Sequence, residues 1–308
     1  MAEDSKIYLD FVSQPDFEKI LTNPILDIAA RFWDEERYEA FRLTYRSMRI
    51  IDDLVDNRKA TGRKITEQEK AVLKGMINDW LRAFIERNPY DDFQRQLLET
   101  LEKFQIPKWP WQRLAKAMVY DLEHNGFESL PVYLRYTEGA AIAPASIFMH
   151  LCGVTKDGER YNKPHFDIRK AARPLAIFSY LVHIVRDFEK DQNENLNYFA
   201  RDLLRQNNLT EADLKPIAQT GEYPDSFRSL MATYHHITDY YRNKSRQLLN
   251  QLLPTLDDKY RLSLELIYHL YLQIFERIDP INGSFSTAAL NPTPSEVKTR
   301  IEKTIEII

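Results

Sequence analysis

Three aspartates stand close together in "YRSMRIIDDLVDNRK", residues 45–59, which otherwise has the apolar pattern of a buried helix. On a helical wheel, one narrow stripe carries four polar side chains at steps of three and four residues: Tyr45, Arg49, Asp52 and Asp56. Apolar residues flank this stripe, as at the wall of a cavity, although a solvated helix face of ordinary width has a similar pattern. This stretch alone leaves two interpretations open, a water-exposed face or a site for a divalent cation.

A second stretch, "SYLVHIVRDFEKDQNEN", repeats the spacing with Tyr180, Asp187 and Asp191. His183 lies near that stripe, and Arg186 directly precedes the first acid. Apolar residues fill the rest of the wheel, so this helix is expected to be mostly buried. An unpaired carboxylate in a core costs on the order of several kcal/mol unless it is protonated, paired or bound to metal. Two helices that each carry such a pair of aspartates are therefore less well explained by solvated helix faces than the first stretch taken alone.

Magnesium fits this pattern best among cations. It prefers hard oxygen ligands, keeps several waters, and is usually bound by one or two carboxylates together with substrate phosphates. Two acidic helices facing across a cleft would hold cations between them, anchoring a diphosphate whose organic tail lies in an apolar cavity. The predicted metal-binding set is Asp52, Asp56, Asp187 and Asp191. Arg49 or Arg186 would assist the anion or neutralise the neighbouring aspartates.

The elements that must position these side chains are helices. Only 8 of the 308 residues are glycine, and 44% are hydrophobic, which favours an all-α fold with a sizeable core. Capping boxes begin helices at Thr66 and at Thr293. Apolar residues at helical spacing fill five further segments: 111–122, 138–152, 171–191, 224–252 and 257–278. No fixed-period repeat or domain linker is visible, so one domain over residues 1–308 is predicted.

Charge and cysteine content limit the possible partners and compartments. The 42 basic and 46 acidic residues are interleaved, so nucleic-acid binding is not expected. The single cysteine, Cys152, excludes an internal disulfide and fits a reducing compartment. The N-terminal "MAEDSKIYLD" does not have the pattern of a secretory signal, and no apolar run is long enough to span a bilayer. A cytoplasmic protein is predicted, with peripheral membrane contact and oligomeric state left open.

Together, the two acidic stretches resemble the squalene/phytoene synthase family, trans-isoprenyl diphosphate enzymes of the all-α isoprenoid synthase fold. The family's first motif, Tyr-x-x-x-Arg-x-x-Asp-Asp-x-x-Asp, is matched by Tyr45, Arg49, Asp52, Asp53 and Asp56. Its second motif is matched by Arg186, Asp187 and Asp191. The segment "MVYDLEHNGFESLPVYLRYTEGAA" places three more residues as in the family: Asp121, Tyr133 and Gly139. Tyr271 matches more weakly, and the resemblance runs from about residue 45 to residue 278.

The resemblance implies a helical bundle around a central cavity and a Mg²⁺-dependent, head-to-head condensation of two allylic prenyl diphosphates, farnesyl or geranylgeranyl. In that family, the condensation passes through a cyclopropylcarbinyl diphosphate. Catalytic roles are implied for six residues: Tyr45, Arg49, Asp53, Tyr133, Arg186 and Tyr271. Substrate contacts are expected at five: Arg49, Gly139, Tyr180, His183 and Arg186. NADPH stays an open second cofactor that no feature of the sequence supports.

Some positions depart from the family pattern. Tyr180 and His183 stand where Gln and Asn are usual, and Lys190 replaces an acid. Imidazole is a poor ligand for Mg²⁺. Two alternatives therefore stay open, a non-catalytic or divergent isoprenoid-binding protein of the same fold and a class I terpene cyclase. The cyclase is disfavoured because its second metal motif is missing near residues 180–195.

Overall fold

The computed structural model describes residues 25–307 of the chain. The longer helices are α4 (Glu35–Ala60), α5 (Glu67–Ile85), α6 (Asp92–Lys103), α7 (Trp109–Glu123), α8 (Leu130–Ala140), α9 (Ile142–Gly153), α10 (Ile168–Arg186), α13 (Glu211–Thr220), α14 (Asp225–Leu252), α15 (Asp258–Phe275) and α17 (Pro294–Ile307). The shorter elements are α3 (Ile25–Ala30), α11 (Phe188–Asn193), α12 (Arg201–Gln206), the 3₁₀ turn η1 (Leu253–Thr255), α16 (Thr287–Leu290) and an antiparallel hairpin of β1 (Thr155–Asp157) and β2 (Arg160–Asn162). The predicted all-α class is confirmed. The N-terminal segment that was examined for a secretory signal lies outside the described residues.

Local capping fixes several helix starts, as the sequence predicts. At the start of α5, the Thr66 hydroxyl accepts from the Glu69 backbone N–H while the Glu69 carboxylate accepts from the Thr66 backbone N–H. Thr293 and Glu296 form the same reciprocal pair before α17. The Asp34 side chain accepts the Arg37 backbone N–H and begins α4. These bonds satisfy N–H groups that have no partner inside the helix.

Two predicted continuous helices are interrupted in the structure. The segment 138–152 breaks at Ala141, between α8 and α9. The segment 171–191 breaks at Asp187, whose backbone N–H donates to the His183 carbonyl at 2.9 Å at the end of α10. The Asp191 backbone N–H nevertheless donates to the Asp187 carbonyl at 2.8 Å. The two acids therefore stay one helical turn apart despite the break.

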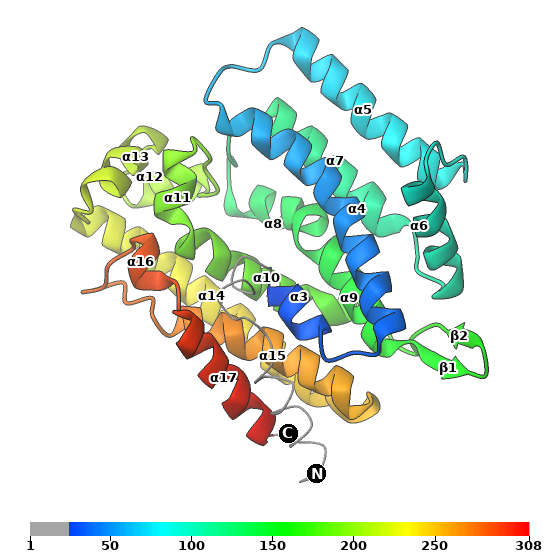
Figure 1. Cartoon of the computed structure of the whole chain (residues 1–308). Helices are drawn as coiled ribbons and strands as arrows, with labels where there is room; N and C mark the ends of the chain where they lie inside the picture. Colours follow the sequence, from blue (N-terminus) through cyan, green and yellow to red (C-terminus); the bar gives the residue numbers. More distant parts are fainter. Residues whose placement is uncertain (1–24, 308) are drawn as a thin grey trace.

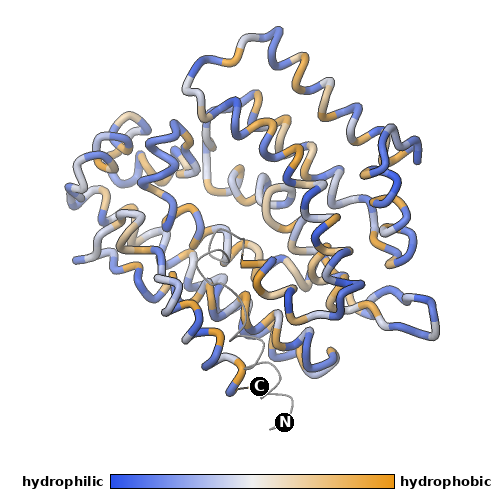
Figure 2. The backbone as a smooth tube through the Cα atoms, in the orientation of Figure 1, coloured by the Kyte–Doolittle hydropathy of each residue, from blue (hydrophilic) through white to orange (hydrophobic). Residues whose placement is uncertain are grey.

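Helix α10 is the centre of the bundle. It packs against α9, α14 and α15, and α4 lies against α7 and α9 on the other side of the molecule (Figure 1). Hydrophobic residues are concentrated where these helices meet, whereas the tip of the β1–β2 hairpin is hydrophilic (Figure 2). Aromatic rings fill much of this core, for example Trp33 against Phe148 at 4.6 Å between ring centroids. Among residues 25–307, no helix combines the length and apolarity that crossing a membrane requires.

Candidate active site

A cavity of about 530 Å³ lies between α4, α8, α9, α10, α11 and α15. Along α10 its lining changes from Ala172 and Leu175 through Tyr180 and His183 to Asp187, at the end of the helix. Along α4 the lining includes three aspartates in the C-terminal half of the helix, followed by Asn57 and Ala60. The apolar part of the wall consists largely of Phe148, Met149, Leu175, Leu264 and Ile267. The cavity therefore has an acidic end and an apolar end.

The structure brings all four predicted metal-binding aspartates to this one cavity: Asp52, Asp56, Asp187 and Asp191. Six other expected site residues also line it, together with Lys190: Tyr45, Arg49, Asp53, Tyr180, His183 and Tyr271. The two acidic stretches thus face one another, as their matching spacing predicts.

On α4, one guanidinium serves two of the three acids. Arg49 forms ion pairs with both Asp52 and Asp53. Asp56 makes no hydrogen bond or ion pair with any residue of the described chain. Burial, together with the neighbouring charge of Asp52, raises the pKa of Asp56 well above its usual value. Burial also raises the pKa of Asp52, against the opposing effect of Arg49. The three carboxylates of the first motif therefore carry more negative charge than its one paired cation, Arg49, compensates.

At the second motif, Arg186 holds Asp187 from both sides of its carboxylate. Nε lies 2.6 Å from Oδ1 and Nη2 lies 2.8 Å from Oδ2. Burial acts to raise the pKa of Asp187, but the hydrogen bonds from Arg186 and the positive charge of Arg186 hold it below its usual value. Asp187 is therefore ionised and fixed in orientation.

His183 is a neutral imidazole in this cluster. Burial, with the adjacent Arg186 charge, lowers its pKa to about 4. Its Nδ1 lies 2.8 Å from Arg186 Nη2, a group that only donates, so Nδ1 accepts and the proton is on Nε2. Nε2 lies 3.1 Å from Asp187 Oδ2. Both ring nitrogens are thus engaged within the protein, which suits His183 to positioning Asp187 rather than to ligating a metal.

Asp191 has no such partners. Its side chain makes no hydrogen bond or ion pair among residues 25–307, although the residue is buried. Burial and the neighbouring Asp187 charge raise its pKa to about 8. Among the four predicted metal-binding aspartates, Asp191 and Asp56 are therefore the two without an ion-paired or hydrogen-bonded cation in the described chain.

Sequence reasoning missed two tyrosines of the cavity wall, Tyr136 and Tyr198. The Tyr136 hydroxyl donates to Asp121 Oδ2 at 2.5 Å, and Asp121 Oδ1 accepts from Lys59 Nζ at 3.0 Å. Tyr198 lies within "NYFARDLL", just after the second acidic stretch. The signal that could have found Tyr136 is its position one helical turn after Tyr133.

Three expected site residues lie behind the cavity wall rather than on it. Tyr133 is fully buried, with its ring stacked on Tyr180 at 5.8 Å and 7°. Arg186 pairs with Asp187 and is not among the residues that line the cavity. Gly139 faces α7, where a Cβ atom would lie 2.3 Å from the Arg113 carbonyl oxygen. The expected substrate contact at Gly139 is thus corrected to a role in close helix packing, and Tyr133 reaches the cavity only through Tyr180.

The donor set suits Mg²⁺ that is shared with a substrate. Within the described ranges of the chain, no three His, Cys, Asp or Glu side chains converge tightly enough to enclose an ion by themselves. Mg²⁺ is typically bound by one or two carboxylates plus waters and phosphate oxygens, so it does not need such a cage. Asp56 and Asp191 lie on opposite walls of the cavity, and no cation of the described chain compensates either one. Their negative charge is available to cations that would bridge to a diphosphate.

Without divalent cations, the protein is expected to become less stable as the pH rises from about 6.5 to about 8. The unfolded chain releases the Asp191 proton near pH 3.8, whereas the folded protein keeps it until about pH 8. In that window the folded state holds more protons, so raising the pH favours unfolding. Below about pH 6.5, His183 acts in the opposite sense because its folded pKa is lowered. Thermal unfolding in EDTA across this range measures the effect, at about 2–4 °C for each kcal/mol lost.

The matched control is Asp191→Asn, which cannot titrate. Its melting temperature is expected to vary less with pH than that of the wild type between about pH 6.5 and about pH 8. An identical pH dependence in both proteins would contradict the assigned environment of Asp191.

The fold of the chain is similar to the folds of two solved synthases. It is similar to a dehydrosqualene synthase solved in complex with a ligand, with a TM-score of 0.72 and 15% identity, covering 99% of this chain and 97% of that one. The squalene synthase HpnC from Alicyclobacillus acidocaldarius is similar with a TM-score of 0.62 and 15% identity, covering 86% of this chain and 90% of that one. At these identities the similarity establishes the fold.

The family follows from the sequence comparison. The sequence model of the squalene/phytoene synthase family matches residues 27–291, so the chain belongs to that family. Chloroplastic phytoene synthase 2 of Oryza sativa subsp. japonica is 26% identical over 202 residues, which are 64% of this chain and 46% of that protein. Chloroplastic phytoene synthase 2 of Zea mays is 26% identical over 194 residues, 61% of this chain and 44% of that protein. The matched region spans less than half the length of these relatives.

Proposed function

We propose that this protein is a Mg²⁺-dependent prenyltransferase that joins two allylic prenyl diphosphates, farnesyl or geranylgeranyl, head to head. The observation that carries the proposal is the single cavity whose acidic end unites both motifs and whose other end is apolar. The acidic end can hold a diphosphate through Mg²⁺, and the apolar end suits a prenyl chain. Membership of the squalene/phytoene synthase family supports the same reaction class.

The cations would be held by Asp52, Asp56, Asp187 and Asp191, and when bound they supply electrophilic assistance to departure of the diphosphate. Arg186 and His183 hold Asp187 in one orientation, so its carboxylate is preorganised. Arg49 lies between the acids and can donate to a diphosphate oxygen once one is present. Departure of the diphosphate leaves an allylic cation, which the double bond of the second substrate attacks. Loss of a proton then gives a cyclopropylcarbinyl diphosphate.

Aromatic residues are suited to protect that cation. Tyr45 and Tyr271 line the cavity from α4 and α15, and Tyr180 lines it from α10. Burial raises the pKa of Tyr271 and of Tyr180, so their hydroxyls stay protonated and do not act as competing nucleophilic anions. Ring faces stabilise nearby positive charge, and an apolar wall excludes water that would quench it.

The test is incubation of the purified protein with farnesyl or geranylgeranyl diphosphate and Mg²⁺, followed by mass analysis of extracted lipids. The expected product contains two prenyl chains and at most one diphosphate, and it forms only with Mg²⁺. Binding of prenyl diphosphate without any condensed product would instead support a non-catalytic isoprenoid-binding protein. A product with a single prenyl chain would indicate a terpene cyclase. The cytoplasmic location, membrane contact and use of NADPH stay predictions.

A further inference from the structure

We propose that a second cavity, outside the active-site cavity, binds a free diphosphate anion. It has a volume of about 380 Å³ and lies between the loop that follows α4, the C-terminal end of α7 and Asn195. Four cationic side chains line it, Lys59, Arg63, Lys64 and Lys70, against the two carboxylates of Asp121 and Glu123. Binding at this cavity requires neither Mg²⁺ nor a prenyl chain, so it is independent of the proposed condensation.

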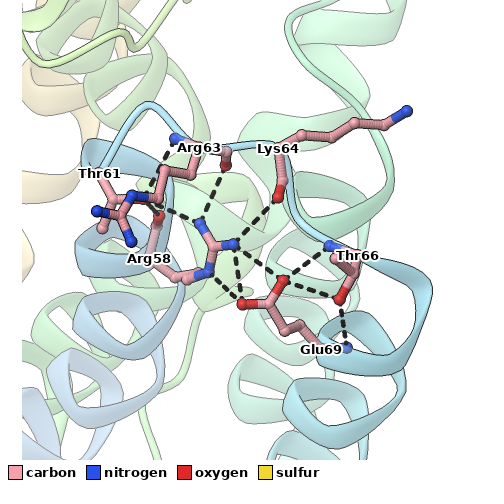
Figure 3. Close-up of polar contacts among 6 residues, drawn as sticks. All are labelled: Arg58, Thr61, Arg63, Lys64, Thr66 and Glu69. Atoms are coloured by element: carbon pink, nitrogen blue, oxygen red, sulfur yellow. Dashed lines mark hydrogen bonds and ion pairs between the residues drawn. The ribbon is translucent and has the colours of Figure 1, made fainter.

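The two carboxylates of this cavity already have partners. Asp121 Oδ1 lies 3.0 Å from Lys59 Nζ, and Glu123 Oε1 lies 2.5 Å from Lys74 Nζ. Arg63 and Lys64, in contrast, make no side-chain hydrogen bond or ion pair with any residue from 25 to 307. Both residues are exposed, and their side chains leave the loop in opposite directions (Figure 3). They are two cations at the rim of the cavity that no ion pair compensates, in a chain whose overall net charge is −4. A small anion is the complementary ligand.

The loop that carries these cations is held in place by Arg58 (Figure 3). The Arg58 guanidinium donates to the carbonyls of Arg63 at 3.0 Å and Lys64 at 3.2 Å, and also to the Glu69 carboxylate at 2.9 Å. Glu69 in turn caps α5 through Thr66. The backbone at residues 63–64 is thus fixed before any ligand binds, which reduces the entropy lost on binding.

A neutral donor completes the cavity. Asn195 Oδ1 accepts from Lys215 Nζ at 2.7 Å, which turns the amide nitrogen of Asn195 toward the loop. That nitrogen approaches Gly62 so closely that a Cβ atom there would lie 2.7 Å from it. Gly62 also has a φ of +65°, which other residues adopt only with strain. Only glycine therefore lets the loop and Asn195 close around this space.

The lining favours an inorganic anion over a nucleotide. Its apolar members are Ile65 and Leu122, and it contains no Trp, Tyr or Phe ring on which a base could stack. Diphosphate is also the by-product of the proposed reaction, but free diphosphate and a diphosphate ester present the same group. The ligand chemistry is therefore a diphosphate group, and the assay has to compare its two sources.

Lys59 and Asp121 connect this cavity to the active site. Lys59 lines the second cavity, and its partner Asp121 also accepts the hydroxyl of Tyr136 at 2.5 Å. Tyr136 lines the active-site cavity. An anion that attracts Lys59 would weaken the ion pair between Lys59 and Asp121. Binding in the second cavity would therefore affect Asp121 and its partner Tyr136, which lines the active-site cavity.

Isothermal titration of the full-length protein with sodium diphosphate in EDTA tests the proposal. We expect saturable binding of one diphosphate, with ADP binding no more tightly. In Arg63→Ala/Lys64→Ala the affinity is expected to fall at least about tenfold, since a hydrogen bond to a charged group is worth about 1.5–3 kcal/mol. Neither side chain makes a hydrogen bond or ion pair with residues 25–307, and both residues are exposed, so helicity and melting temperature are expected to be unchanged.

Two control variants make the result specific. Arg82→Ala/Arg95→Ala removes two exposed cations elsewhere and is expected to bind diphosphate like the wild type. Asp52→Asn changes the active-site cavity, and it is also expected to bind normally when Mg²⁺ is absent.

The proposal is overturned if wild-type protein shows no saturable binding, or if Arg63→Ala/Lys64→Ala binds as tightly as wild type. Equal losses in both double variants would also overturn it, since they indicate unspecific attraction. Tighter binding of ADP would reassign the cavity to a diphosphate ester.

Discussion

Asp52→Asn and Asp187→Asn are each expected to reduce Mg²⁺-dependent condensation about a thousandfold, equivalent to roughly 4 kcal/mol of transition-state stabilisation. The two residues lie on opposite walls of one cavity, at the C-terminal ends of α4 and α10. An amide keeps the size of the side chain but removes the charge that would hold the cation. Turnover by mass analysis of the condensed product measures the effect.

The fold is expected to survive Asp52→Asn. Asp52 pairs with a half-exposed Arg49, which keeps Asp53 as a partner, so helicity and melting temperature should change little. The matched control is Asp79→Asn, which neutralises an acid that is 72% exposed on α5. Wild-type activity in both Asp52→Asn and Asp187→Asn would refute the assigned role of the acidic motifs.

Gly139→Ala is expected to destabilise the protein by about 2–3 kcal/mol, lowering the melting temperature by roughly 5 °C or more. The added Cβ would lie 2.3 Å from the Arg113 carbonyl oxygen and 2.6 Å from Ala117 Cβ, both on α7. Neither atom is at the end of a flexible side chain, so α7 and α8 have to separate. The same movement would displace Tyr136 and Ala140 on α8, which line the active-site cavity.

Gly75→Ala is the matched control. Gly75 lies inside α5, and nothing lies within 4 Å of the position where its Cβ would be. Alanine there is expected to stabilise the helix by about 0.5–1 kcal/mol. Thermal unfolding distinguishes the two substitutions by sign. Equal melting temperatures in the two variants would show that α7 and α8 are not packed as described.

The acidic walls of the cavity could be predicted from the sequence because they depend on the spacing of residues that are close together in the chain. Asp52 and Asp56 share a face of α4 through helical periodicity alone, and the capping boxes at Thr66 and Thr293 begin helices through contacts three residues apart. That two such faces meet is a tertiary fact, but it could be inferred because the spacing of Asp187 and Asp191 repeats that of the first pair.

Other features depend on contacts distant in sequence and were not predictable. The breaks at Ala141 and Asp187 interrupt apolar patterns that continue through them. The hairpin at residues 155–162 lies between the apolar segments 138–152 and 171–191, where no element was predicted. The role of Gly139 depends on α7, more than twenty residues earlier in the chain.

The most direct test of the central claim is calorimetric binding of a prenyl thiodiphosphate, whose carbon–sulfur bond resists ionisation, with and without Mg²⁺. If both acidic motifs hold the diphosphate through Mg²⁺, tight binding requires Mg²⁺ and weakens at least about tenfold in Asp56→Asn and in Asp191→Asn. Binding that is equally tight without Mg²⁺ and in both variants would contradict the account.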